Sequence, residues 1–294
     1  MSLVVRPMRS DDIEEAERLS DTGYLELDRR TQQRDWPEPR PRGNGGSQRW
    51  RSRVGHLLAT DPEGCWVAEV DGRLGGVAVA AVRDLTWILA SLVVRPDLQG
   101  QRVGTALFEV ARRHGRHCLR GMLNASADQR AVRTYRRAGF DLHPQMFLHG
   151  AVDRTALPVL DRVREGTDGD RELADSVARR LRDAAHGPDH DWLAGAHRMV
   201  VVDRPDRQGF AYSDGLGTPV LLAATHRRAA VELLWAVLAE SAPDRDVTVD
   251  RVTGANQWAL DVAVAAGLRV HQRGYLALHG LRPPGPYLPH GSLL

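Results

Sequence analysis

The stretch that decides the fold is residues 92–107, which read LVVRPDLQGQRVGTAL. The apolar run Trp87–Val94 predicts a strand covered on both faces, and Pro96 ends it. Helical spacing of apolar residues then predicts a helix over Val103–Arg113. A tight turn, Gln99–Gly104, therefore connects a buried strand directly to a helix.

This turn has the properties of an anion site. The first N–H groups of a helix have no internal partner, and they lie at the positive end of the helix dipole. Glycines let the backbone approach a bulky diphosphate closely, and Arg102 adds a positive charge. The pattern favours a pyrophosphate cradle at Gln99–Gly104. A plain strand–helix turn with glycines remains the alternative.

A second informative segment, residues 128–140, reads DQRAVRTYRRAGF. Asp128 can cap a helix, and Gly139 is placed to end it. Because seven residues make about two helical turns, Tyr135 is expected on the same helix face as Asp128. A core aromatic is the alternative interpretation of this tyrosine.

Together the two segments resemble motifs A and B of the GNAT superfamily, the GCN5-related N-acetyltransferases. Val94 and Pro96 fit the strand end of motif A, and Gln99 and Gly104 fit the first and last turn positions. Arg102 departs from the pattern, because the family usually has glycine there. In motif B, an aspartate replaces the common asparagine at the helix start.

The resemblance implies direct acyl transfer from acetyl-CoA to a primary amine of a small molecule or peptide, within a ternary complex and without a metal. The donor would lie in a V between strands Trp87–Val94 and Leu119–Asn124, and Tyr135 would protonate the departing thiolate. The expected donor-binding residues are Leu92, Val93, Val94, Gln99, Gly100, Gln101, Arg102, Val103, Gly104, Thr105, Asp128 and Tyr135. A non-catalytic acyl-CoA-binding or sensing protein is the rival class.

The sequence does not single out a general base. Asp84 and Glu69 are candidates by strand position alone. A water chain, or an amine that is already partly neutral, would serve instead.

The chain also repeats its plan. Val5-Arg6 and Asp12 are echoed by Val163-Arg164 and Asp170, in the same relative order. Residues 128–131 and 138–140 are echoed by 256–259 and 266–268. We therefore predict an α/β (α+β) fold of two tandem GNAT-like domains, 1–152 and 153–294, each a mixed, mostly antiparallel sheet flanked by helices. Coincidence between short Ala/Gly-rich strings is the alternative.

The second copy differs from the first at the chemistry-bearing positions. Tyr135 maps to Ala263, and the region after the strand Pro219–Ala224 lacks the glycine turn. We expect this copy to be degenerate, with a structural role or a role in shaping the substrate cleft. The mycothiol synthases are tandem relatives whose C-terminal half is catalytic, and activity of that kind would leave Gly104 and Tyr135 dispensable.

Several local features complete the predictions. A helix is expected over Asp12–Leu19, followed by an irregular loop or lid over Arg29–Gly46. The resemblance implies that this loop borders the acceptor site. Its arginines, Arg40 and Arg42 among them, would favour an acidic acceptor, although codon bias explains them equally well. The C-terminal tail, rich in proline, is expected to pack as an extended segment. The cysteines, Cys65 and Cys118, are expected to be core residues, and His186, His190 and His197 to be surface histidines rather than metal ligands.

Composition excludes several classes of protein. The 294 residues carry a net charge of only +2, and arginine supplies every one of the 40 basic side chains. That balance and the 5% aromatic content do not indicate nucleic-acid binding. No membrane span or signal peptide is predicted, so we expect a cytoplasmic protein without membrane or nucleic-acid partners. It would be a monomer, in effect a pseudo-dimer of its two domains, or a homodimer.

Overall fold

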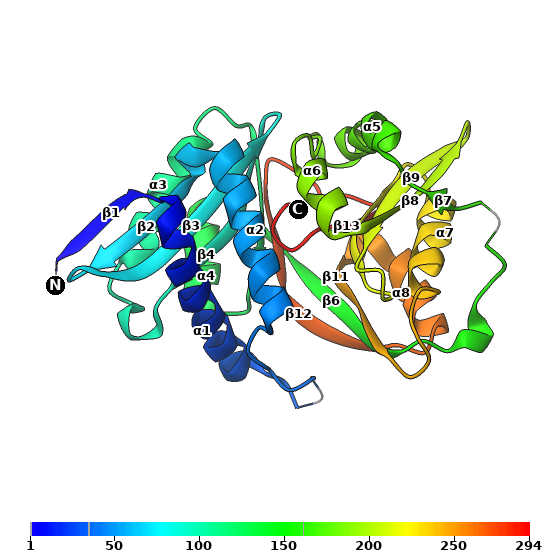
Figure 1. The fold of residues 1–294 in the computed structure, drawn as a ribbon, viewed down its shortest axis with the longest axis horizontal. Helices are drawn as coiled ribbons and strands as arrows, with labels where there is room; N and C mark the ends of the chain where they lie inside the picture. Colours follow the sequence, from blue (N-terminus) through cyan, green and yellow to red (C-terminus); the bar gives the residue numbers. More distant parts are fainter. Residues whose placement is uncertain (1, 35, 161) are drawn as a thin grey trace. The chain divides into compact units, whose positions relative to one another are not determined.

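The computed structural model describes residues 2–34, 36–160 and 162–294, which divide into two units (Figure 1). Unit 1 comprises Met1–Leu123 and Ala127–Ala138, and unit 2 comprises Asn124–Ser126 and Gly139–Leu294. Both are mixed α/β units with mostly antiparallel strand pairing, as predicted. Among the described residues, every helix is too short or too polar to cross a membrane.

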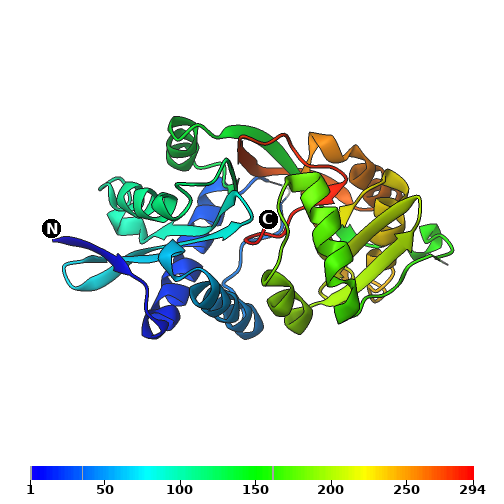
Figure 2. The same ribbon diagram turned by 90° about the horizontal axis from the view of Figure 1, so that it is seen from above.

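Unit 1 is one twisted sheet with helices on both faces (Figure 2). Its strands pair in the order β1-β2-β3-β4-β5, antiparallel except for the parallel pair β4–β5. In chain order the elements are β1 (Leu3–Pro7), α1 (Ile13–Thr31), α2 (Asn44–Thr60), β2 (Cys65–Val70), β3 (Arg73–Arg83), β4 (Thr86–Val94), α3 (Val103–His114), β5 (Arg120–Ala125) and α4 (Gln129–Arg137).

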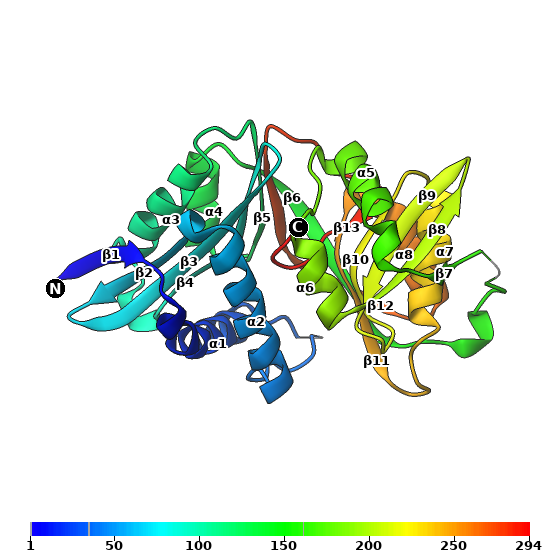
Figure 3. The ribbon, with the colours of Figure 1, turned by 45° about the horizontal axis from the view of Figure 1, so that its top comes forward.

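Unit 2 contains a second helix-covered sheet and a three-stranded antiparallel group (Figure 3). The sheet has the order β13-β10-β9-β8-β7, and in the other group β6 lies between β12 and β11. The elements in chain order are β6 (Asp141–Ala151), β7 (Arg164–Glu165), α5 (Arg171–Arg182), α6 (Asp189–Ala196), β8 (Arg198–Arg204), β9 (Arg207–Ser213), β10 (Pro219–Ala224), α7 (Arg227–Leu238), β11 (Asp246–Thr253), α8 (Gln257–Ala265), β12 (Arg269–His279) and β13 (Tyr287–Leu288).

The repeated Arg–Asp signature has the same geometry in both copies. Arg6 donates two hydrogen bonds of 2.8 Å to the Asp12 carboxylate, and Arg164 donates the equivalent pair to Asp170. Each aspartate also accepts a backbone N–H three residues earlier, which closes the turn before the helix. The sequence echo therefore reflects one local structure built twice.

The region between residues 12 and 60 differs from its prediction. Helix α1 continues to Thr31 instead of ending at Leu19, and its Gly23 packs directly against β4. The expected loop over Arg29–Gly46 shrinks to residues 32–43, of which residue 35 lies outside the described part. Helix α2, which the sequence analysis missed, buries Trp50, Val54 and Leu57 at helical spacing.

Strand β6 belongs to unit 2 by its contacts. It is one strand with a bulge opposite β12. Because it pairs with both β11 and β12, residues 139–151 group with the C-terminal half of the chain. The boundary at 152/153 divides the chain by sequence repeat and stays a prediction.

Candidate functional site

The strand β4 opens away from β5 at its C-terminal end. Parallel pairing joins Thr86–Leu89 to Arg120–Leu123, and no further β4–β5 pair occurs among the described residues. The β3–β4 register shifts opposite Ala90, which marks a bulge. Residues 90–94 are therefore not paired with β5 on this edge.

The turn after β4 is held by its own side chains. Gln99 donates from Nε2 to the Val94 carbonyl at 3.2 Å, and Gln101 donates to the Asp97 carbonyl at 3.0 Å. Gly100 has φ +85°, a conformation that favours glycine. These contacts fix where α3 begins relative to the end of β4.

The first turn of α3 offers a set of backbone donors. The amide of Ala106 is the first to bond back into the helix, to the Arg102 carbonyl at 3.0 Å. Within the described parts of the chain, the amides of residues 102–105 have no acceptor. Arg102 and Thr105 are exposed and Gly104 is half-buried, so these donors can reach an anion from solution.

Arg102 adopts the conformation that glycine would adopt more easily. It is the residue before α3 and has φ +65° and ψ 1°, in the left-handed region. An L-residue there is strained by about 1 kcal/mol relative to glycine. Arg102 is exposed and directly precedes the amides of residues 103–105, so its guanidinium can contribute to anion binding.

Tyr135 lies where the second motif predicted it, on α4. Its side chain is buried and packs on Phe108 of α3, with ring centroids 5.7 Å apart. Burial raises the pKa of the Tyr135 hydroxyl well above its usual value, and the nearby Tyr24 and Asp128 raise it further. The hydroxyl therefore keeps its proton at neutral pH.

Asp128 caps α4 as predicted. Its Oδ1 accepts the Arg130 backbone N–H at 2.7 Å. Burial alone would raise the pKa of Asp128, but hydrogen bonds from Arg130 outweigh it and lower the pKa to about 2. The carboxylate is therefore charged across the neutral range.

Helix α1 supplies three residues of this region that the sequence analysis missed. Arg30 donates to the Asp128 carboxylate, and Tyr24 forms a 3.3 Å hydrogen bond with Ser91 of β4. A Cβ on Gly23 would lie 2.6 Å from the Val93 side chain, so glycine permits the close approach of α1 to β4. Only the glycine was visible as a local signal, since the other contacts join residues far apart in sequence.

The two carboxylates proposed as bases have other positions. Glu69 on β2 forms an ion pair with Arg6 at 2.6 Å. Asp84 lies in the β3–β4 turn, at the end of β4 opposite to Val94. Neither carboxylate joins the group formed by Tyr24, Ser91 and Tyr135.

The arginines of segment 32–43 also have different environments. Arg42 is half-buried, pairs with Glu17 at 2.7 Å and stacks over Trp50 with its guanidinium 5.7 Å from the ring centroid. The Arg42 side chain therefore connects α1 to α2, and its charge is already paired within the protein. Arg40 is exposed.

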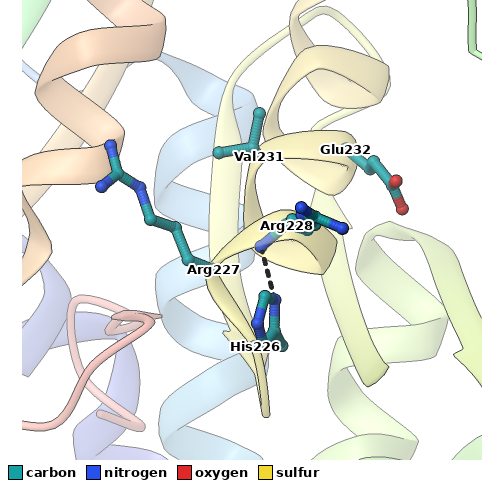
Figure 4. A pocket seen from close by; sticks show the side chains of 5 residues that line it. All are labelled: His226, Arg227, Arg228, Val231 and Glu232. Atoms are coloured by element: carbon teal, nitrogen blue, oxygen red, sulfur yellow. Dashed lines mark hydrogen bonds between the residues drawn. The ribbon is translucent and has the colours of Figure 1, made fainter. Parts of the chain in front are cut away.

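The described residues of the second copy show no counterpart of this arrangement. At the start of α7, the His226 imidazole accepts the Arg228 backbone N–H at 3.1 Å, so a side chain already caps the helix (Figure 4). A hollow of about 430 Å³ lies beside it, lined by His226, Arg227, Arg228, Val231 and Glu232. Ala263, in the place of the tyrosine, is buried in α8.

The histidine prediction was partly wrong. His186 and His190 are buried rather than on the surface, because each finds hydrogen-bond partners in the interior of unit 2. His190 bonds Asp175 and the Tyr212 hydroxyl, both at 3.0 Å. Over the residues that the structure describes, no cluster of His, Cys, Asp or Glu is arranged to hold a metal.

The cysteine prediction is met at Cys65, which is fully buried, whereas Cys118 is only half-buried. Burial raises the pKa of the Cys65 thiol to about 12, and the charge of Asp61 adds to this effect. A thiol of this kind is inert, so we assign Cys65 no role in the site.

Comparison with known proteins gives a consistent result. Residues 27–140 match the family model described as the acetyltransferase (GNAT) family. No curated protein matches the chain.

Several solved structures resemble the chain over nearly its whole length. A putative acetyltransferase from Pyrococcus horikoshii superposes with a TM-score of 0.74 and 15% identity, covering 96% of this chain and 90% of its own. A GCN5-related N-acetyltransferase from Sphaerobacter thermophilus has a TM-score of 0.56 and 15% identity, covering 94% and 95%. A tandem GNAT protein from the clavulanic acid biosynthesis pathway has a TM-score of 0.52 and 17% identity, covering 94% and 98%. At these identities the likeness concerns the fold, and the matched folds extend over both units.

Proposed function

We propose a donor, an acceptor class and a mechanism for this chain, which is an acyltransferase of tandem GNAT-like fold whose residues 27–140 match the GNAT family. In our proposal it transfers an acetyl or related acyl group from acetyl-CoA to a primary amine of a small molecule or peptide. The chemistry belongs to the first copy.

The single observation that carries the proposal is the set of backbone amides at residues 102–105 that have no acceptor. This set includes Gly104 and the exposed Arg102. Four N–H donors at one helix start suit the diphosphate of coenzyme A. The helix dipole and the Arg102 guanidinium add favourable charge at the same place. The residues from Gln99 to Thr105 would hold this end of the donor.

The rest of the donor would follow the open edge of β4. Backbone groups of Leu92–Val94 would bond the amides of the pantetheine arm as a neighbouring strand does. An N–H group of this edge would donate a hydrogen bond to the thioester carbonyl oxygen and stabilise the charge that develops on it. The bulge at Ala90 supports this role, because bulges redirect backbone groups next to active sites.

The reaction then needs one proton donor. A neutral amine attacks the thioester carbon, a C–N bond forms and the C–S bond breaks. Tyr135 donates its hydroxyl proton to the departing sulfur, and the amine releases one proton to water, from which the tyrosine is reprotonated. The raised pKa of Tyr135 keeps it protonated until the thiolate forms.

The acceptor would approach from the side of α1. Tyr24 of α1 forms its hydrogen bond with Ser91 of β4 on that side, and the resemblance implies that the segment after α1 borders the acceptor. Asp128, whose charge acts on Tyr135, is already paired with Arg30 and Arg130, and neither Glu69 nor Asp84 joins this group. We therefore propose that the amine binds neutral or loses its proton through water.

Substitution of Tyr135 by phenylalanine tests the mechanism. We expect the turnover number to fall by about 10²–10⁴-fold while the affinity for coenzyme A changes little, because only the proton transfer is removed. Tyr212→Phe, at a buried tyrosine of the second copy, is the matched control and should retain activity. Full turnover by Tyr135→Phe, under conditions where chemistry limits the rate, would refute the role.

Two alternatives give different results in the same assays. A non-catalytic acyl-CoA-binding or sensing protein would bind coenzyme A at the α3 turn but acylate no amine. Activity of the mycothiol-synthase kind would survive substitution of both Gly104 and Tyr135. The capped start of α7 and the alanine at position 263 argue against chemistry in the second copy.

A further inference from the structure

The C-terminal tail of the chain occupies a specific place in unit 2. Residues 287 and 288 form β13, which pairs antiparallel with Ala223 and Leu222 of β10. The Ala224 amide donates to the Pro286 carbonyl at 3.2 Å and extends this ladder. Segment 286–288 is therefore bound along β10 as an added strand.

The strand β10 is the counterpart of β4. Each is an inner strand that leads into a 12-residue helix, α7 or α3. The next strand in each copy, β11 or β5, leads into the short helix that carries motif B or its echo, α8 or α4. In the described residues β11 pairs with β6 and not with β10, and β13 contacts both β10 and β11. In the second copy, the tail thus lies at the position that corresponds to the opening beside β4 in the first copy.

Motif B of the second copy helps to bind the tail. Asn256, the counterpart of Asp128, accepts the Tyr287 backbone N–H at 2.8 Å through Oδ1. Its Nδ2 donates to the Pro284 carbonyl at 3.0 Å. In the first copy, the Asp128 side chain caps α4 and binds Arg30. In the second copy, the side chain of its counterpart Asn256 binds the tail.

The tail is also bound from the α5 side. The Tyr287 hydroxyl lies 3.3 Å from His186 Nε2. Arg182, which is fully buried, donates to the carbonyls of Leu293 and Leu294. These contacts explain why buried basic groups occur in a part of the chain that the proposed reaction does not use.

We propose that segment 286–288 occupies the place that the pantetheine arm of an acyl thioester takes along the central strand of a GNAT-like copy, and competes with such a ligand for it. The inference rests on the proposed function, because it transfers the donor geometry of β4 to β10. The second copy is then a thioester cleft closed by the chain's own tail. The class of ligand that it would take, once the tail is displaced, is a pantetheine or coenzyme A thioester.

Chains of residues 1–294 that carry Gly104→Asp provide the test, because a carboxylate at the start of α3 repels the donor from the first copy. Leu288→Asp is added to displace the tail, since Leu288 is buried against the core. Leu216→Asp is the matched control, because the same substitution there alters an exposed leucine of the same unit. The probes are pantetheine and coenzyme A, and the readouts are hydrogen exchange at the Ala224 amide and calorimetric titration.

We expect Leu288→Asp to accelerate exchange at Ala224 by about tenfold or more, and millimolar pantetheine to slow it again. Coenzyme A should bind one site in the chain that carries Gly104→Asp and Leu288→Asp, and none in the control that carries Gly104→Asp and Leu216→Asp. Accelerated exchange that neither probe reverses, with β8 and β9 still protected, would overturn the proposal.

If Leu288→Asp removes the protection of β8 and β9, the same measurement is made with the milder Leu288→Ala. Loss of protection in this variant too would overturn the proposal, since the segment would be an indispensable strand and not the occupant of a cleft. Failure of the proposed function would give a different result, because the wild-type chain would then bind no coenzyme A. The effect of pantetheine on exchange at the Ala224 amide would still show whether the tail can be replaced by a ligand.

Discussion

Substitution of Asp128 should separate its role as a helix cap from its role as a charge. Asp128→Ala removes the cap of α4 and the ion pair with Arg30. Loss of an N-cap costs about 1 kcal/mol. The ion pair contributes about 0.5 kcal/mol, because the Arg30 side chain is 41% exposed. We therefore expect Asp128→Ala to lower the unfolding free energy of unit 1 by about 1.5 kcal/mol, and Asp128→Asn, which keeps the capping oxygen, by about 0.5–1 kcal/mol.

The charge contribution should depend on pH in a defined direction. The folded-state pKa of Asp128, about 2, lies below its ordinary value of 3.8. A depressed carboxyl pKa stabilises the fold above pH 4, and this stabilisation disappears as the pH falls from about 4 to 2. The shift sets an upper bound of about 2.5 kcal/mol, which partial exposure of the partners reduces to about 1 kcal/mol. The difference between wild type and Asp128→Asn should therefore shrink at low pH.

The assay is urea unfolding at pH 7 and pH 3, followed by pulsed hydrogen exchange at the backbone amides of α4. A double-mutant cycle with Arg30→Ala isolates the ion pair and should give a coupling of about 0.5 kcal/mol at pH 7. The reasoning is refuted if Asp128→Asn is as destabilising as Asp128→Ala, or if the coupling is absent. A pH-independent difference between wild type and Asp128→Asn would refute the electrostatic part alone.

Two further predictions concern the turn and the thiols. Arg102→Gly should relieve the strain of the positive φ and raise the free energy of unfolding by up to about 0.5 kcal/mol, since the entropy of glycine offsets part of the gain. The same substitution should weaken coenzyme A binding several-fold and reduce the salt dependence of that binding. Calorimetry at two ionic strengths checks this, and unchanged affinity would exclude a role for the guanidinium. In the native protein at pH 8, a thiol reagent should modify Cys118 and leave Cys65 intact, because burial raises the pKa of Cys65 to about 12. Peptide mass spectrometry identifies the labelled cysteine, and rapid labelling of Cys65 would contradict its burial.

Local signals in the sequence were sufficient for the parts of the site that are built from contiguous residues. The turn Gln99–Gly104, the Asp128 cap and the Arg–Asp pairs at each helix start are short-range structures with strong residue preferences. The turn and the cap lie at the predicted positions, whereas the Arg–Asp pairs were visible only as a sequence echo and their hydrogen bonds were not predicted. The role of Arg102 as a left-handed residue could be inferred only from the glycine that the family has there.

The remaining features depend on contacts between distant residues. No local pattern connects Arg30 to Asp128, or Tyr24 to Ser91, because each contact depends on how α1 crosses β4. Helix α2 was missed since Asn44-Gly45-Gly46 looks like loop, although Trp50, Val54 and Leu57 already had helical spacing. The tail was expected to be extended, but its position along β10 follows from tertiary pairing alone.

The measurement that tests the account most directly is the titration of coenzyme A into two chains that differ in where a carboxylate is added. Gly104→Asp adds it at the start of α3, and Arg228→Asp adds it at the equivalent, exposed start of α7. We predict one coenzyme A per chain for wild type and Arg228→Asp, and a loss of affinity of at least about 100-fold for Gly104→Asp, because charge repulsion and lost amide contacts act together. Binding that survives Gly104→Asp and disappears in Arg228→Asp would locate the donor in the second copy and contradict the account.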